Sequence, residues 1–106
     1  MEKRFSEMTE NELKQTIAEL KINIQRAEQM GMINEVAVHE RKMAMAEAYL
    51  MNPEDFHPGE IYFLKYEDNI PFKIEYMNGV FAWGYRGEAS EISAFPISLL
   101  QSSESN

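Results

Sequence analysis

The chain has 106 residues, of which 44% are hydrophobic, and its formal net charge is −8. This size fits one domain, or one small domain with an appendage, and the hydrophobic share excludes an intrinsically disordered protein. The absence of cysteine excludes disulfides, thiolate metal sites and cysteine nucleophiles. Because no stretch approaches the ~20 apolar residues of a membrane span, we expect a cytoplasmic protein without membrane contact.

The acidic charge is concentrated in the second half of the chain. Residues 1–51 carry seven basic and nine acidic side chains, a balance of −2. Residues 52–106 carry three basic and nine acidic side chains, a balance of −6. Nucleic-acid binding depends on neutralising phosphates, so this distribution makes a nucleic-acid partner unlikely.

The first predicted helix begins after Thr9. The letters TENE form a capping box, in which Thr9 bonds the amide of Glu12 and Glu12 reaches back to Thr9. Apolar residues then recur at spacings of four and three, which predicts one buried side. This stripe consists of Leu13, Ile17, Leu20, Ile24 and Ala27. Gly31 is expected to end the helix, and the short link that follows makes the next helix an antiparallel neighbour.

The second predicted helix begins at Asn34 as its cap and ends before Asn52-Pro53. It has two apolar faces, one with Val36, Met43, Ala46 and Leu50, the other with Val38, Met45 and Tyr49. A helix that is apolar on two sides packs on two neighbours. One neighbour is the first helix, and the other is either the second half of the chain or another protein.

The second half of the chain reads as short strands over residues 60–66, 72–77 and 80–86. Asn78-Gly79 is a strong two-residue hairpin signal between the last two. This turn would place Phe72, Ile74, Tyr76, Phe81, Trp83 and Tyr85 on one side of the sheet. We expect that aromatic side to be mainly core, with a partly open binding face as the alternative. Residues 94–100 close the chain as a short strand or a 3₁₀ turn.

Together these elements predict an α+β chain, with a helical hairpin over 1–52 and a small curled barrel over 53–106 in one folding unit. In the first strand Tyr62, Leu64 and Tyr66 would face the barrel interior, and Ile61 and Phe63 the other side. The second apolar face of the second helix would then cover this other side.

Three blocks of the sequence resemble a family of small uncharacterised proteins from Bacillus-type bacteria, typified by YfhH. The blocks are NEVAVHERKMAMAEAYLMNPEDFHPGEIY, NGVFAWGYR and FPISLL, and the resemblance extends from about Arg4 to Leu100. It implies an SH3-like β-barrel with an N-terminal α-hairpin. It implies no established activity, although members are sometimes labelled transcriptional regulators, and it assigns no catalytic or binding residue.

The residues themselves indicate no catalytic centre, and we expect no enzyme, metal or cofactor. His39 lies in mid-helix without a histidine partner one turn away. His57 lies near Glu54, Asp55 and Glu60, a group that could hold a divalent ion but is better interpreted as a solvated linker. The serines occupy no nucleophile elbow, and no glycine-rich phosphate loop is present.

The leading hypothesis is a non-enzymatic protein-interaction module, monomeric or homodimeric through the hairpin. Its partner would be a protein or peptide, and a basic one fits best, because Glu67-Asp68, Glu88 and Glu91 form an acidic rim on the loops. The candidate partner-binding residues are Tyr62, Tyr66, Trp83, Tyr85 and Arg86 in the second half, with Met45 and Tyr49 in the second helix. The alternative is a transcriptional regulator that binds nucleic acid through Lys14, Lys21, Arg26, Arg41 and Lys42 on the hairpin.

Overall fold

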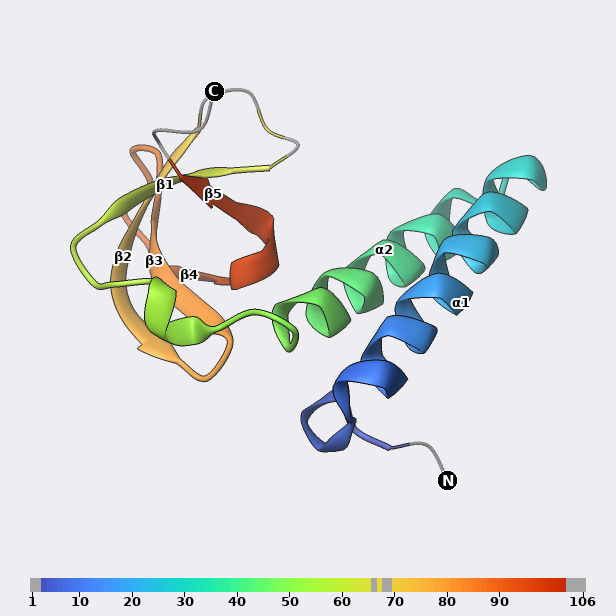
Figure 1. Cartoon of the computed structure of the whole chain (residues 1–106). Helices are drawn as coiled ribbons and strands as arrows, with labels where there is room; N and C mark the ends of the chain where they lie inside the picture. The colour runs from blue at the N-terminus through green and yellow to red at the C-terminus, as the bar shows by residue number, and fades with distance from the viewer. Residues whose placement is uncertain (1–2, 66, 68–69, 103–106) are drawn as a thin grey trace. The chain divides into compact units, whose positions relative to one another are not determined.

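The chain is α+β, with two helices followed by a five-stranded antiparallel sheet (Figure 1). The computed structural model describes residues 3–65, 67 and 70–102. It divides into two compact units, Met1–Leu50 and Met51–Asn106, which we take in turn.

The first unit is an antiparallel helical hairpin, α1 (Glu10–Gln29) and α2 (Ile33–Ala48), preceded by the 3₁₀ helix η1 (Phe5–Glu7). The predicted capping box is confirmed. Thr9 Oγ1 accepts from the Glu12 amide at 3.2 Å, and Glu12 Oε1 accepts from the Thr9 amide at 2.9 Å. Four of the five residues of the predicted stripe, Leu13, Ile17, Leu20 and Ala27, are buried, and the fifth, Ile24, is intermediate in burial.

The prediction that Asn34 caps the second helix is wrong. Met32 is the N-cap of α2, without a side-chain cap bond, and Asn34 lies in the first turn. The cause is the compact link. Gly31 adopts a left-handed φ of 70° immediately after α1, and the Met32 amide donates to the Ala27 carbonyl, so the chain enters α2 two residues earlier.

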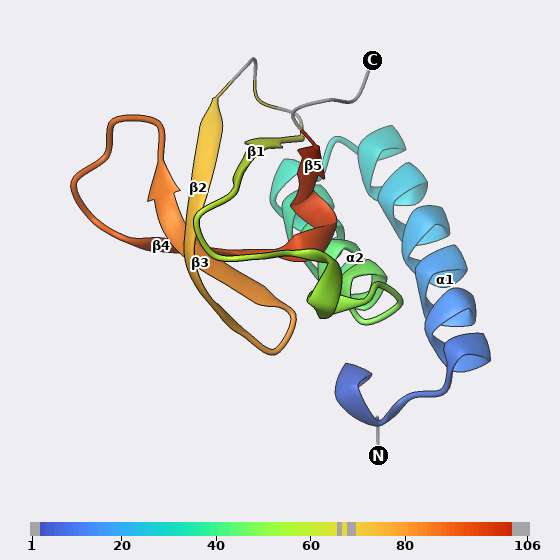
Figure 2. The ribbon, with the colours of Figure 1, turned by 60° about the vertical axis from the view of Figure 1, so that its left-hand side comes forward.

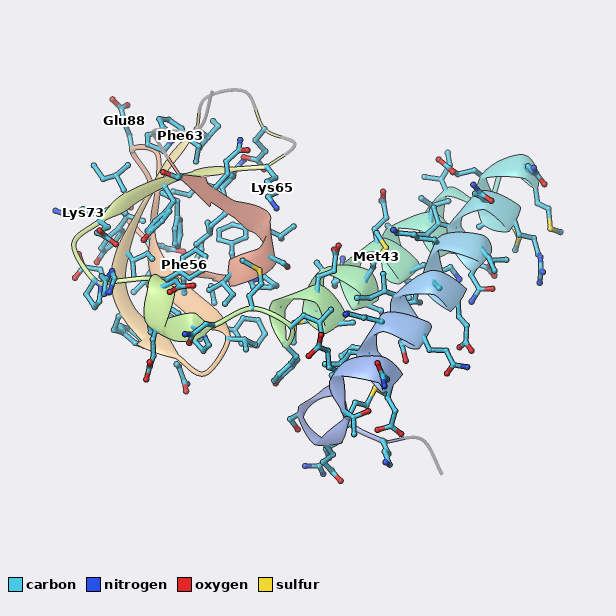
Figure 3. The ribbon with its side chains drawn as sticks, in the orientation of Figure 1. Met43, Phe56, Phe63, Lys65, Lys73 and Glu88 are labelled. Atoms are coloured by element: carbon cyan, nitrogen blue, oxygen red, sulfur yellow. The ribbon has the colours of Figure 1, made fainter. Side chains whose placement is uncertain are left out.

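The core of the first unit is a cluster of Leu13, Ile17 and Ala46, with Phe5, Met8, Met43 and Tyr49 packed against it. Figure 3 labels Met43 on α2. The predicted two faces of α2 are therefore corrected. Leu50 of the first face is 36% and Val38 of the second face 46% exposed. Tyr49 follows the last helical residue, and it joins Met43 at this cluster instead of a separate second face.

The second unit contains β1 (Ile61–Leu64), β2 (Pro71–Asn78), β3 (Phe81–Arg86), β4 (Ser93–Pro96) and β5 (Leu100–Ser102), and η2 (Pro53–Asp55) precedes the first strand. The strand order is β4-β3-β2-β1-β5. A 3₁₀ helix η3 (Ile97–Leu99) joins β4 to β5 and returns the chain to β1 (Figure 2). Within the described residues the pairings leave β4 and β5 as edges, so the sheet is not closed.

The register of the β2–β3 hairpin differs from the prediction. Gly79 and Val80 form the turn, one residue later than predicted, so Asn78 pairs with Phe81 and Met77 pairs with Ala82 in place of Val80. A bulge between Ile74 and Tyr76 adds one further residue to β2. The moved turn alone keeps Tyr76 on the same side as Trp83. Because facing alternates along a strand, the bulge is what places these two on the opposite side of the sheet from Phe72 and Ile74.

The expectation that six hairpin residues share one buried side is therefore wrong. Phe72 and Ile74 are fully buried, whereas Tyr76 is 47% and Tyr85 36% exposed. The buried positions of β3 are instead Ala82 and Gly84, which the predicted register assigned to the polar side. The aromatic row of this hairpin lies mainly on the outer side of the sheet.

Close contact between strands explains this arrangement. A Cβ on Gly84 would lie 1.9 Å from the carbonyl oxygen of Lys73 on the neighbouring strand, so only glycine fits there. The buried side is built from small residues of β3 and large residues of other strands. Phe72 meets Phe95 edge-on with ring centroids 5.2 Å apart, and Leu64, Ile74, Val80, Ile97 and Leu100 are also buried.

Candidate functional site

The most distinctive surface of the second unit is the outer side of its sheet, here called the outer aromatic face. It consists of Ile61, Lys73, Tyr76, Trp83 and Tyr85. Lys73 pairs with Ile61 on one side and Tyr85 on the other, which places the three in one row across the sheet. Tyr76 pairs with Trp83 in the adjoining row.

Two rings of this face form a stacked pair. The centroids of Tyr76 and Trp83 are 5.8 Å apart and their planes differ by 6°. Ile61 is 49% exposed, and Trp83 is intermediate in burial. Exposed aromatic rings held on a sheet are rigid, so they offer contact area at low entropic cost.

Charge on and near this face has both signs. Lys73 extends away from the sheet (Figure 3), and Glu75 is exposed at the bulge next to Tyr76. Glu88 and Glu91 are exposed on the segment between β3 and β4. Among the described residues none of these three acids has an ion-pair partner. Residues 52–106 as a whole carry a net charge of −6.

The structure brings together only part of the predicted binding set. Trp83 and Tyr85 lie on the outer aromatic face. Tyr62 and Arg86 both pair with the buried Phe72, so they lie on the other side of the sheet. Tyr66 lies outside the described residues. Met45 and Tyr49 belong to the first unit.

Arg86 has a structural partner. Its Nε and Nη2 donate to Glu67 Oε2 at 2.9 and 2.6 Å. This pair ties the segment after β1 to the end of β3, so Glu67 is a neutralised member of the predicted acidic rim. The other rim residue on this segment, Asp68, lies outside the described residues.

Sequence reasoning missed Tyr76 and Ile61 as surface residues. The bulge at Glu75 is what turns Tyr76 outward, and Ile61 follows from its pairing with Lys73. A glycine inside a strand pattern is a signal of a bulge or of close backbone approach. Gly84 gave that signal.

A second polar cluster lies at the entry to β1. Glu60 Oε1 accepts from the Tyr62 hydroxyl at 2.5 Å and lies 2.9 Å from His57 Nδ1. The Tyr62 hydrogen bond, followed by that of His57, lowers the pKa of Glu60. Burial and the Glu60 carboxylate raise the pKa of Tyr62 to about 12. This raised pKa opposes formation of a phenolate nucleophile at neutral pH.

His39 lies on α2 beside two hollows of the first unit, and its Nδ1 atom is buried without a hydrogen-bond partner. No group of three or more histidine or acidic side chains in the described part of the chain is arranged to hold a metal ion. No helix within the described ranges has the length and apolar character needed to cross a membrane.

These features define a small α+β protein with an exposed aromatic sheet face. The chain matches the family model described as "Protein of unknown function (DUF1811)" over residues 3–101, and it belongs to this family. It is 53% identical over 105 residues to "Uncharacterized protein YfhH" of Bacillus subtilis (strain 168). That alignment covers 98% of this chain and the whole of the relative, so the resemblance seen in the sequence is confirmed.

Proposed function

We propose that this chain is a non-enzymatic, cytoplasmic protein-interaction module whose outer aromatic face binds a basic polypeptide segment. The observation that carries the proposal is the stacked pair of Tyr76 and Trp83 beside the exposed Tyr85, on the acidic half of the chain. Tyrosine and tryptophan dominate the binding energy of many protein interfaces because they combine large apolar area with a polar edge.

The charge around this face favours a cationic partner. A net charge of −6 on the second half attracts basic chains and raises their association rate. The rings themselves attract guanidinium and ammonium groups through cation–π contacts. Lys73 repels a cation at one end of the face, so the basic side chain is best placed over Tyr76 and Trp83, next to Glu75.

The architecture also supports a finer fold proposal. The order β4-β3-β2-β1-β5, with a 3₁₀ helix between β4 and β5, is typical of small SH3-like barrels. That fold hosts many unrelated activities, so the likeness assigns no function by itself. It supports a rigid scaffold on which exposed side chains recognise a partner.

The proposal predicts binding of a labelled decapeptide rich in arginine and lysine, followed by fluorescence anisotropy. We expect Tyr76→Ala and Tyr85→Ala each to raise the Kd about tenfold, because truncating an interface aromatic costs about 1–2 kcal/mol. Ile92→Ala is the matched control, since Ile92 is 40% exposed but lies outside the face. Its Kd should equal that of the unaltered chain.

Three results would overturn this proposal. One is a Kd that the two tyrosine variants leave unchanged. Another is equal affinity for an acidic decapeptide of the same length. The third is salt-sensitive binding to a DNA duplex in place of the basic peptide, which would indicate phosphate contacts and the transcriptional-regulator hypothesis. Lys14 already forms an ion pair with Glu10 at 2.9 Å, which reduces the basic surface open to phosphate.

A further inference from the structure

A groove runs along one flank of the helical hairpin. It consists of two adjoining hollows of about 750 and 520 Å³ that share Asn23 and His39. Apolar side chains line it, among them Leu20, Ala27, Met30 and Val38. Met30 is 66% and Val38 46% exposed, so the groove presents apolar surface that the helical hairpin itself leaves uncovered.

The charges along this groove follow one pattern on both helices. On α1, Glu19, Asn23 and Arg26 recur at spacings of four and three, which places them on one face. On α2, Glu35, His39 and Lys42 recur at the same spacings. Each helix therefore carries an acidic, an uncharged polar and a basic side chain in this order along the groove.

The two helices run antiparallel, so the acids and bases lie on opposite diagonals (Figure 1). Glu19 and Lys42 line one hollow, while Arg26 and Glu35 line the other. None of these four side chains forms an ion pair among the described residues. These four helical charges thus place one acid and one base in each hollow. The larger hollow is also lined by Lys3, Arg4 and Glu12, of which Lys3 and Glu12 form an ion pair at 3.0 Å.

From this pattern we propose that the groove binds a second copy of the same chain to form a symmetric homodimer with a four-helix core. A two-fold axis crossing the groove at Asn23 and His39 sets α1 antiparallel to its copy. Glu19 then meets Arg26 of the second copy, and Glu35 meets Lys42. The groove is complementary in charge to itself, whereas a uniformly basic or acidic partner would meet a like charge at each end.

The size of the groove agrees with such an interface. A two-fold axis at Asn23 pairs the α1 lining from Thr16 to Met30, about 21 Å of helix at 1.5 Å per residue. Two helices of about 10 Å diameter give a projected area of roughly 400 Å². A corrugated surface exposes more area than its projection, which approaches the ~800 Å² per partner of a specific interface. This proposal does not depend on the outer aromatic face.

Light scattering coupled to gel filtration on the full chain tests the dimer. At about 100 μM protein we expect a mass twice the 12.3 kDa of one chain. A basic variant, Glu19→Arg with Glu35→Lys, makes all four charges positive, and we expect its dimer Kd to rise at least tenfold. An acidic variant, Arg26→Glu with Lys42→Glu, makes them all negative and should behave alike.

Mixing the two variants in equal amounts should restore the dimer, because each supplies the charges that the other lacks. This recovery separates a lost interface from a failure to fold. Glu28→Arg with Glu40→Lys is the control for added basic charge, since both residues are exposed outside the groove. It should remain dimeric. A monomeric unaltered chain, dimers that persist in both charge variants, or a mixture that stays monomeric would each contradict the proposal.

Discussion

Replacing Gly84 with alanine is expected to unfold the second unit or to destabilise it by about 3–5 kcal/mol. The added Cβ would lie 1.9 Å from the carbonyl oxygen of Lys73, 2.8 Å from its carbonyl carbon and 3.0 Å from the Cα of Ile74. All three atoms belong to the backbone of the paired strand. No rotamer change relieves such a clash, so β2 and β3 must separate.

Gly79→Ala is the matched control for this substitution. Gly79 has a φ of 59°, but a Cβ there would meet no atom within 4 Å. Its cost is the left-handed backbone alone, about 1 kcal/mol. Chemical denaturation of both variants measures the difference in free energy of unfolding. Equal stability of the two variants would show that the register of β2 against β3 is not the one described.

The second large effect is expected at Phe72. This ring is fully buried and meets Phe95 edge-on, so Phe72→Ala should cost about 3–5 kcal/mol. Tyr76→Ala in the same strand should cost about 1 kcal/mol or less, because Tyr76 is 47% exposed and loses mainly its stacking on Trp83.

Denaturation with urea measures both costs in the same assay. The comparison discriminates between the two registers of the hairpin. In the regular hairpin predicted from the sequence, with an Asn78-Gly79 turn and no bulge, both rings lie on the buried side and both substitutions are strongly destabilising. If Tyr76→Ala lost as much free energy of unfolding as Phe72→Ala, Tyr76 would lie on the buried side. The hairpin would then be regular, and the outer aromatic face would not be present as described.

The helical half of the chain was largely predictable from local chemistry. The capping box at Thr9 and the apolar stripe of α1 depend on residues within a few positions of each other. The capping box is confirmed, and four of the five stripe residues are buried. The start of α2 was not predictable in this way. The left-handed turn at Gly31 lets the helix begin after Met32, so the Asn34 side chain lies inside the helix and does not cap it.

The positions of the strands were predictable from the sequence, but the side of the sheet on which each side chain lies was not. Alternation in β1 correctly placed Leu64 inside, where it is 3% exposed. In the β2–β3 hairpin, the bulge between Ile74 and Tyr76 reversed the assignment of Tyr76, Trp83 and Tyr85. The bulge sets Gly84 opposite Ile74 and against the Lys73 backbone, a contact between strands that periodicity does not encode.

Collisional quenching of Trp83 fluorescence by acrylamide tests the outer aromatic face most directly. Trp83 is the only tryptophan, so the signal reports on this face alone. We predict that acrylamide quenches it in the free native chain, and that the basic decapeptide reduces this quenching while an acidic one does not. A Trp83 that is shielded in the free chain, or whose quenching the basic peptide leaves unchanged, would contradict the account.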